Sequence, residues 1–291
     1  AIEIAMCIAS CIVFEYLYNK IAKKPNTIHD LSAVVTGLLL AMNLPALNMG
    51  AHPIAVFAMP IIGSLFSIVI AKMLFGGLGQ NFINPALAGR AFLVASYPTL
   101  MTGSAFVPTN FMKGVDAATY ATPLAQIKEA GALNTSFFDL LVGNCGGTIG
   151  ETCAIALILG GVYLIVKKVI SWRTPVVYIA TVLVLTYIFK LSGIEAASAR
   201  QPIQELFAGG LMLGAFFMAT DYASTPVTPK GKIIMGLGCG IITVLIRVFG
   251  GYPEGVSYSI LLMNLAAPLI DRYTAPKKFG YVKPVKVKEV K

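Results

Sequence analysis

Residues 116 to 126 read DAATYATPLAQ, a hydroxyl-rich stretch with one acidic residue in a chain that is apolar nearly throughout. An exposed hydroxyl on such a small-residue turn can enter the active site of another enzyme and become modified. Pro123 restricts the residue before it to extended backbone, which favours that approach. The alternative interpretation is an ordinary flexible polar loop. The hydroxyls of this stretch are the first groups of the chain that could do chemistry.

Charged side chains also lie within or beside apolar segments, where an unpaired charge costs at least a few kcal/mol on insertion scales. An arginine keeps its charge at physiological pH, so each one must face a carboxylate or a wet interface. Glu151, Asp221 or Asp271, or the surface of another subunit, are the partners we prefer for the two arginines. The residues concerned are Asp30, Arg90, Glu151, Asp221, Arg247 and Asp271.

Asp30 and Asp221 flank two short apolar segments that occupy corresponding places in the two halves of the chain. Unwound backbone carbonyls and one carboxylate could bind a small cation there. The competing role is capping of a helix end, which aspartate performs in any protein. Capping is the favoured role for each acid taken singly, and ion binding is a hypothesis.

Cysteine and histidine do not indicate a metal cluster built by this chain alone. The five cysteines form no CxxC pair and the chain has two histidines. The glycine-rich stretch GNCGGTIGETC, residues 143 to 153, leads into an apolar segment, and the N–H groups of a helix start there could hold an anion. It lacks the Lys-Ser/Thr pair of a phosphate-binding loop, so a tight re-entrant turn is the preferred interpretation.

The elements that must position these residues are membrane helices. Of the 291 residues 57% are hydrophobic and 12% are charged, well below the usual quarter, which indicates an integral membrane protein. A bilayer span needs about 20 apolar residues and excludes unpaired backbone, so the spans are helical. We predict an all-α protein with about nine segments, near residues 1–19, 31–44, 54–75, 85–98, 150–168, 174–190, 205–219, 232–249 and 256–271.

Basic residues give these segments an orientation. If the segments alternate across the bilayer, most of the 22 lysines and arginines collect on one side, together with residues 272 to 291. The positive-inside rule places that basic tail in the cytoplasm and the 99–149 loop outside. The net charge of +9 is then a topology signal and gives no support for nucleic-acid binding.

An internal repeat is predicted from paired segments. LLLAMNLP (38–45) is similar to LMLGAFFMATD (211–221), and GGLGQN (76–81) is similar to GGYPEG (250–255). If one further helix precedes Ala1, each half has five helices, and the odd number makes the halves inverted. Broken helices at matching positions indicate a site near the midplane; ordinary glycine-rich helix packing is the alternative. The predicted parts are a first repeat (1–98), an outer loop (99–149), a second repeat (150–271) and a cytoplasmic tail (272–291).

Several stretches together resemble the D subunit of the Rnf ferredoxin:NAD oxidoreductase complex and its relative, the B subunit of the sodium-pumping NADH:quinone reductase. The resemblance covers nearly the whole chain and implies ten helices, of which the first is absent here, in a fold similar to urea channels. It is carried by DLSAVVTGLLLAMNLP (30–45), GGLGQNFINPALAGRAF (76–92), GGTIGET (146–152), FMATDYASTPVTPKGK (217–232) and IRVFGGYPEGVSYSILLMNLAAPLIDRYTAP (246–276).

The resemblance also implies an attachment site for FMN, joined through its phosphate to a threonine hydroxyl. The flavin transferase of such proteins recognises Asp, two residues, Ser or Thr, Gly, Ala and Thr. In this chain the pattern falls on Asp116, Thr119, Tyr120, Ala121 and Thr122, with Thr122 as the acceptor. Tyr120 departs from the pattern, because a bulky side chain stands where glycine would allow unusual backbone angles.

The function that the resemblance implies is electron transfer within an ion-translocating oxidoreductase, with the flavin supplying the redox chemistry. Electrons would enter from an outer flavoprotein subunit, reach FMN on Thr122 and return inward, coupled to sodium or proton transport; riboflavin is implied as a second, noncovalent flavin. Implied partners are the A, B, C, E and G subunits, a flavin transferase and lipid of the bacterial cytoplasmic membrane, and the chain would not be catalytic alone.

Two other functions stay open at this stage. The chain could be the quinone-reductase B subunit, although the TPL after the flavin site and the PLIDR ending favour the Rnf protein. It could also be a passive channel for a small solute such as urea, because an inverted five-helix repeat is typical of urea channels. A channel has no need of a flavin attachment pattern, so detection of a covalent flavin would separate it from the other two.

Overall fold

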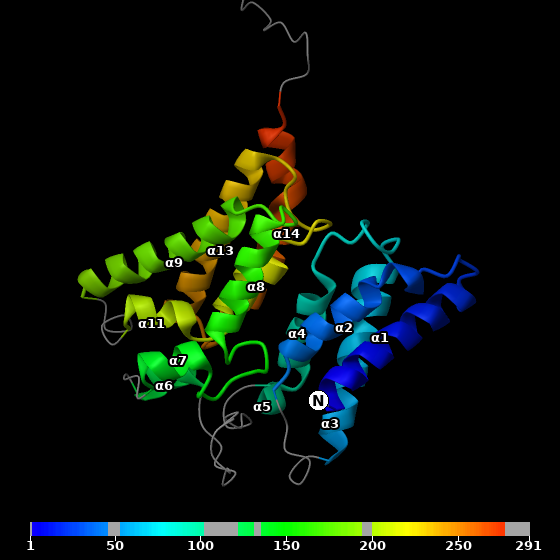
Figure 1. Ribbon diagram of the computed structural model, residues 1–291, viewed down its shortest axis with the longest axis horizontal. Coiled ribbons are helices and arrows are strands. Elements are labelled where there is room, and N and C mark those ends of the chain that lie inside the picture. Colours follow the sequence, from blue (N-terminus) through cyan, green and yellow to red (C-terminus); the bar gives the residue numbers. More distant parts are fainter. Residues whose placement is uncertain (1, 46–52, 102–121, 131–134, 194–199, 277–291) are drawn as a thin grey trace, which may run out of the picture.

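The computed structural model describes residues 2–45, 53–101, 122–130, 135–193 and 200–276, and all regular structure in these ranges is helical (Figure 1). Each of the predicted apolar segments contains a helix, so the all-α prediction is confirmed. Four helices in the described ranges are long and apolar enough to cross a membrane: Ile2–Ile21, Ile54–Met73, Arg173–Leu191 and Pro229–Phe249. The chain is an integral membrane protein.

The N-terminal part of the chain forms one helix group, coloured blue to cyan in Figure 1. Within it α1 packs along both α2 and α3, and α4 packs against α3 and its continuation η2. The helix α3 passes directly into the π-helical turn η2, so the two form one long element. The bounds are α1 Ile2–Ile21, η1 Ile28–Asp30, α2 Ser32–Met42, α3 Pro53–Leu65, η2 Phe66–Met73, α4 Pro85–Ser96 and α5 Pro98–Met101.

The C-terminal part forms a second group, coloured green to red. Its most extensive packing joins α13 to α9, and α13 also packs along α14. The two groups meet through α4 and α14, which lie side by side at the centre of the molecule. The bounds are α6 Pro123–Ala130, α7 Phe137–Val142, α8 Ala154–Val166, α9 Arg173–Leu191, α11 Pro202–Phe207, α12 Leu211–Leu213, η3 Gly214–Met218, α13 Pro229–Phe249 and α14 Val256–Thr274.

The short segment predicted at 205–219 is a broken helix, as expected from the sequence. Helix α11 ends at Phe207, Gly209 takes a φ of +71°, and the chain restarts as α12 and then the π-helical η3. A positive φ of this kind is accessible to glycine at little cost. The break leaves main-chain N–H and C=O groups without helical partners in the interior, where bilayer physics requires that protein groups satisfy them.

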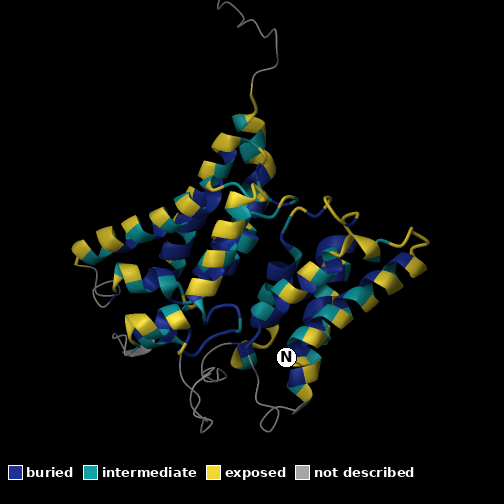
Figure 2. Cartoon of the chain, viewed as in Figure 1, coloured by how far each residue is buried: buried dark blue, intermediate teal, exposed yellow. Residues whose placement is uncertain are grey.

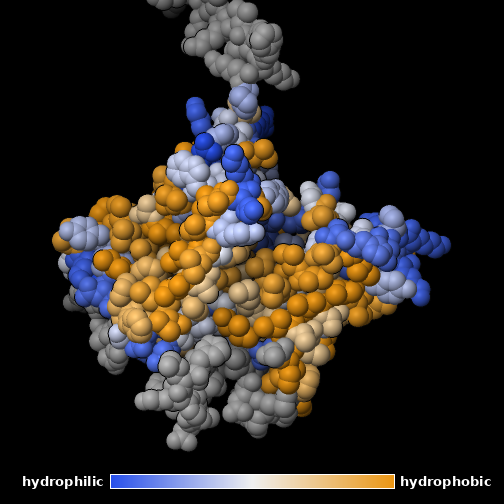
Figure 3. Space-filling model, in the orientation of Figure 1, coloured by the Kyte–Doolittle hydropathy of each residue, from blue (hydrophilic) through white to orange (hydrophobic). Residues whose placement is uncertain are grey.

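Apolar side chains cover the outside of both groups. Figure 2 shows exposed positions along the outer faces of α1, α8 and α9 and buried positions toward the centre, and Figure 3 shows a broad apolar band around the same helices. Exposed large residues such as Leu159, Val166 and Leu191 belong to this surface. Such a surface suits a lipid environment, whereas the inverted relation of the two halves stays a prediction.

A sealed ion pair lies inside the first helix group. Lys72 Nζ is 2.6 Å from Glu15 Oε2, with the two side chains 3% and 0% exposed. The lysine also donates to Ser32 Oγ at 2.6 Å, and Thr27 donates to the other carboxylate oxygen of Glu15. One positive and one negative charge therefore balance each other away from solvent, within α1, η2 and the start of α2.

Candidate functional site

Thr122 lies directly before α6 and caps its first turn. Its Oγ1 accepts a hydrogen bond from the Ala125 N–H at 3.3 Å, and its carbonyl oxygen accepts one from the Gln126 N–H at 2.9 Å. A hydroxyl at this position is the preferred type for an N-cap. The half-buried Thr122 also lines a cavity. The remaining residues of the predicted flavin pattern, Asp116, Thr119, Tyr120 and Ala121, lie outside the described residues.

The cavity lies at the contact between the two helix groups and has a volume of about 60 Å³. It joins α4, the start of α6, the 143–153 turn and the turn between α13 and α14. Its lining is Arg90, Ala91, Val94, Met101, Thr122, Leu124, Glu151, Gly209, Tyr252, Pro253, Glu254, Ser257 and Tyr258. A space of this size holds a few water molecules and is smaller than the roughly 300–1,000 Å³ of ordinary ligand pockets.

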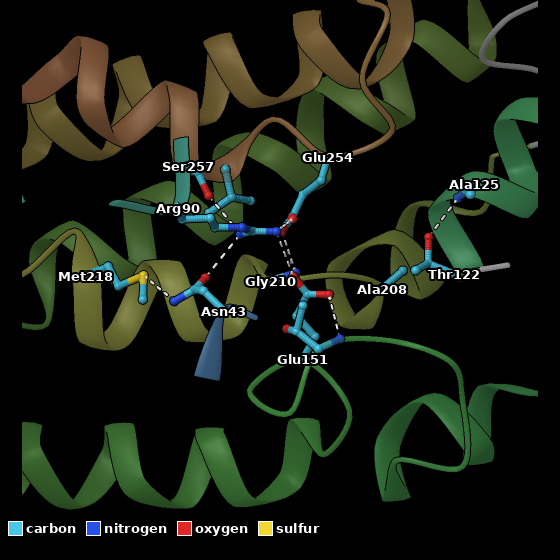
Figure 4. Close-up of polar contacts among 12 residues, drawn as sticks. Asn43, Arg90, Thr122, Ala125, Glu151, Ala208, Gly210, Met218, Glu254 and Ser257 are labelled. Carbon is cyan, nitrogen blue, oxygen red and sulfur yellow. Dashed lines mark hydrogen bonds and ion pairs between the residues drawn. The ribbon is translucent and has the colours of Figure 1, made fainter. Parts of the chain in front are cut away.

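Arg90 projects from α4 and joins four separate segments (Figure 4). Its Nη2 contacts Glu151 Oε1 at 3.3 Å and makes a very short contact with Glu254 Oε2. Its Nη1 donates to Asn43 Oδ1 at 3.1 Å and to Ser257 Oγ at 2.8 Å. The guanidinium fork thus uses both terminal nitrogens on partners from the end of α2, the 143–153 turn, the 250–255 turn and α14.

Main-chain N–H groups complete the hydrogen bonding of the two carboxylates. The Thr148 N–H donates to Glu151 Oε2 at 3.5 Å, within the glycine-rich turn before α8. The Gly210 N–H, freed by the break between α11 and α12, donates to Glu254 Oε1 at 2.7 Å. A Cβ at Gly210 would lie 2.5 Å from Glu254 Oε1 and 3.1 Å from Glu151 Oε1, so glycine allows both carboxylates to approach this backbone.

Arg90, Glu151 and Glu254 form a group that we call the Arg90 cluster. Its negative charges outnumber its positive charge. Two carboxylates face one guanidinium, and the side chains are 11%, 7% and 16% exposed in that order. Glu151 lies in the turn between helices, where burial and then the charge of Glu254 raise its pKa from an ordinary 4.5 to about 8. The cluster can therefore hold a proton at neutral pH.

The structure pairs Arg90 with Glu151, as preferred from the sequence, but it corrects the partners preferred for Arg247. The Arg247 guanidinium donates to the carbonyl oxygens of Glu205 at 2.9 Å and Ala208 at 3.3 Å, not to Glu151, Asp221 or Asp271. The physical reason is the break after α11, which leaves these carbonyls unpaired in the interior. Nothing in the linear pattern indicates which carbonyls are free.

Asp30 and Asp221 make hydrogen bonds within turns, whereas Asp271 in α14 accepts from the turn before α13. Asp30 accepts from the Ser32 N–H at 2.8 Å, Asp221 from Ser224 Oγ at 2.7 Å, and Asp271 from the Val227 N–H at 3.0 Å. The contacts of Asp30 and Asp221 lie within their own turns, and the N-cap residue of α2 is Leu31, which makes no side-chain capping bond, so the helix-capping role stays a prediction. They do not involve the Arg90 cluster, and cation binding by Asp30 or Asp221 stays a hypothesis.

Glu254 was not predicted from the sequence. The GGYPEG stretch indicated only a repeat, although a charged residue in a short turn between two apolar spans is itself a signal for a partner. The missing information was spatial, because Glu254 and Arg90 are 164 positions apart. The structure brings together Arg90, Glu151 and Thr122 from the predicted set and adds Glu254, Ser257 and Asn43.

Comparison with known proteins gives consistent matches. A family model described as the NQR2, RnfD, RnfE family matches residues 1–280. The D subunit of the Na⁺-translocating ferredoxin:NAD⁺ oxidoreductase complex of Acetobacterium woodii is 50% identical over 284 residues, covering 96% of this chain and 82% of the relative. The proton-translocating counterpart of Clostridium ljungdahlii is 47% identical, with 94% and 82% covered. The D subunit of the ion-translocating oxidoreductase complex of Actinobacillus succinogenes is 34% identical, with 96% and 86% covered.

Proposed function

Because the chain belongs to the NQR2, RnfD, RnfE family, we propose that it is the D-type membrane subunit of an ion-translocating ferredoxin:NAD⁺ oxidoreductase complex. The support is the match over nearly the whole length to relatives that carry this name. Within the complex the subunit relays electrons, and the work of ion translocation is shared with the A, B, C, E and G subunits. The complex lies in the bacterial cytoplasmic membrane, with Thr122 on the outer side and the C-terminus inside.

The proposed attachment point for FMN is the hydroxyl of Thr122, loaded by a flavin transferase that recognises the 116–122 pattern. The lining of the adjoining cavity suits a flavin chemically. Tyr252 and Tyr258 stack with their ring centroids 5.4 Å apart and offer aromatic surface, and Arg90 offers a positive charge. As it stands the cavity is too small to enclose a flavin ring, so the ring would contact this lining rather than lie in a closed pocket.

The bound flavin supplies the one- and two-electron chemistry, and the residues of the chain supply position and electrostatics. Arg90, already fixed by four partners, offsets the negative charge of Glu151 and Glu254 beside the cavity, which would otherwise oppose the arrival of an electron. Leu124, Val94 and Met101 provide the apolar side of the lining and limit the water around it. Preorganised charge of this kind needs little rearrangement when an electron arrives.

Riboflavin, as a second and noncovalent flavin, belongs to the same proposal. A larger cavity of about 470 Å³ lies between the end of α8 and the segment after η3. Trp172 and Tyr222 line it together with Thr220 and Thr225, so it offers aromatic surface and hydroxyl partners. Its volume falls within the ordinary range of small-molecule sites, but Trp172 and Tyr222 are 53% and 74% exposed, so this open groove differs from the site within the helix bundle that the resemblance implies.

The observation that carries the attachment proposal is the position of the Thr122 hydroxyl at the edge of the cavity that holds Arg90. The test is fluorescence of the denatured subunit in a gel, since a covalent flavin survives denaturation. We expect Thr122→Val to lose the fluorescence and Thr135→Val, which lies outside the 116–122 pattern, to retain it. Thr122→Ser keeps the nucleophilic oxygen and should retain part of it. Fluorescence that persists in Thr122→Val would move the attachment site elsewhere.

A further inference from the structure

We propose that Glu151 and Glu254 share one exchangeable proton against Arg90, forming a proton-binding site that opens into the cavity beside Thr122. The proton site itself stands on the contacts of the described residues. Its connection to electron transfer rests on the proposed function.

Charge balance in the cluster calls for one proton. Arg90 is the cation that contacts both carboxylates, whereas Arg247 bonds to main-chain carbonyls and acts on Glu254 from farther away, so the direct contacts supply one positive charge for two negative ones. When two carboxylates share one buried site, the charge of one raises the proton affinity of the other. Glu151 Oε1 and Glu254 Oε2 both contact Arg90 Nη2, so the two carboxyl groups are close neighbours and a proton can lie between them. One proton makes the cluster neutral.

The hydrogen bonds of the two acids disfavour a metal cation in the same place. All four carboxylate oxygens already have a donor. Arg90 contacts one oxygen of each acid. The Thr148 N–H donates to the second oxygen of Glu151, and the Gly210 N–H donates to the second oxygen of Glu254. Cations held by protein oxygens take about six ligands. A proton fits between two occupied carboxyl groups, and a sodium ion would have to displace their donors.

The surroundings of the two acids decide which one carries the proton for most of the time. Arg247 acts electrostatically on Glu254 in addition to Arg90, so Glu254 sees two positive charges and stays ionised more readily. Glu151 lies in the turn before α8 and is the more buried acid. The proton therefore belongs mainly to Glu151. The titratable and charged groups that face the pair are Arg90, Arg247, Cys145, Tyr252 and Tyr258.

Exchange needs a path, and the cavity provides one. Glu151 and Glu254 both line it, and the half-buried Thr122 lies at its other side. The volume is sufficient for a few waters, which can pass a proton to a carboxyl group. If an electron reaches a flavin on Thr122, the added negative charge raises the affinity of the pair for a second proton. One proton then enters from cavity water with the electron and leaves when the electron leaves, so charge balances.

The experiment is infrared spectroscopy of the whole purified complex, which detects the carbonyl stretch of protonated carboxyl groups. In the parent complex we expect a band that shifts in heavy water and disappears as the pH rises through about 8. We expect both Glu151→Gln and Glu254→Gln to lose it, because either acid alone beside Arg90 ionises. Asp139→Asn is the matched control, since this half-buried acid bonds to Asn144 outside the cluster and should leave the band unchanged.

Each result has a defined meaning. A band that persists in either glutamine variant, or a parent complex without a titrating band, overturns the shared proton. Loss of the band on adding sodium chloride at constant pH would show that the site takes a metal cation instead. If a glutamine variant does not assemble, the pH and heavy-water behaviour of the parent complex decides the question.

Two further readouts separate this proposal from the proposed function. The Thr122→Val complex should keep the band, because the proton site needs no flavin. In the parent complex the midpoint potential of the covalent flavin should change with pH, and this dependence should weaken in both glutamine variants. Loss of in-gel fluorescence from the parent would count against the flavin proposal only, while a pH-independent potential with an intact band would count against the coupling only.

Discussion

Two of the buried charge clusters in the described residues differ in both balance and access. The Lys72–Glu15 pair lies within the first helix group, has one charge of each sign, and is almost completely sealed. The Arg90 cluster lies between the two groups, has an additional carboxylate, and borders a cavity shared with Thr122. The first arrangement has no reason to change its protonation state, whereas the second can do so by exchanging a proton with cavity water.

The two clusters also differ in role: the Lys72–Glu15 pair holds helices together, whereas the Arg90 cluster lines a site. A buried pair that loses one partner leaves an uncompensated charge, so such a pair fixes the packing of the helices that carry it. Lys72 and Glu15 join η2 to α1 in this way. The Arg90 cluster draws its members from turns and helix ends, and main-chain N–H groups exposed by broken helices complete it. Irregular backbone at membrane depth is tolerated where it lines such a site.

The largest effect is expected from breaking the balanced pair. Lys72→Met removes the cation from beside Glu15 and should destabilise the folded subunit by roughly 3–5 kcal/mol. The thermal unfolding midpoint of the purified complex, and its yield, measure this. Lys20→Met is the control, because Lys20 is exposed in the last turn of α1 and should change stability little. Equal stability of the Lys72→Met and Lys20→Met complexes would contradict a structural role for the pair.

The next effect concerns the unbalanced cluster and should appear mainly in activity. Arg90→Met leaves two carboxylates that can both take protons from the cavity, so we expect a smaller stability loss than for Lys72→Met. Ferredoxin-dependent NAD⁺ reduction by the complex should fall at least about tenfold, or about 1.4 kcal/mol of barrier. Arg272→Met, at an exposed position of α14, is the control. Full ferredoxin-dependent NAD⁺ reduction by the Arg90→Met complex would show that the cluster has a structural role only.

A smaller effect is a pH dependence of stability that belongs to Glu151. Its folded-state pKa is raised from 4.5 to about 8, so its contribution is complete below about pH 4.5 and is lost as the pH rises through about 8. Burial opposes ionisation of Glu254, but Arg90 and Arg247 outweigh it and lower its pKa, so the contribution of Glu254 changes only below about pH 4.5 and leaves the slope in this window to Glu151. Unfolding midpoints across this window should fall in the parent complex and change less in Glu151→Gln. An unchanged slope would assign it to other groups.

Much of the fold could be predicted from the sequence because apolar length is a strong local signal. The segments near 1–19, 174–190 and 232–249 correspond to α1, α9 and α13, and the short segment at 205–219 is broken as its length suggested. Hydropathy contains no information about pairing across the chain. It therefore marked Arg90 and Glu151 as residues in need of partners but did not identify Glu254, which is distant in sequence.

The partners of Arg247 show the second limit of prediction from sequence. They are carbonyl groups of Glu205 and Ala208, released by the end of α11. A carbonyl is present at every residue, so residue types do not indicate which ones are free. The flavin pattern is of the opposite kind: it was found through a resemblance, and of its residues the structure describes Thr122 alone.

The smallest expected effect comes from separating Glu151 and Glu254 while both of their charges remain. Gly210→Ala adds a Cβ that would lie 2.5 Å from Glu254 Oε1 and 3.1 Å from Glu151 Oε1, so the carboxylates must move although both charges remain. Gly210 has a φ of −79°, which alanine adopts without strain, and the atoms to be displaced end flexible side chains. We therefore expect a stability loss of about 1 kcal/mol or less. The infrared band of the shared proton should nevertheless weaken and titrate at lower pH, because separated carboxylates no longer raise each other's proton affinity.

Gly251→Ala is the matched control, since a Cβ there meets nothing within 4 Å. An identical band in the two variants would mean that the proton depends on burial of Glu151 alone and not on its contact with Glu254.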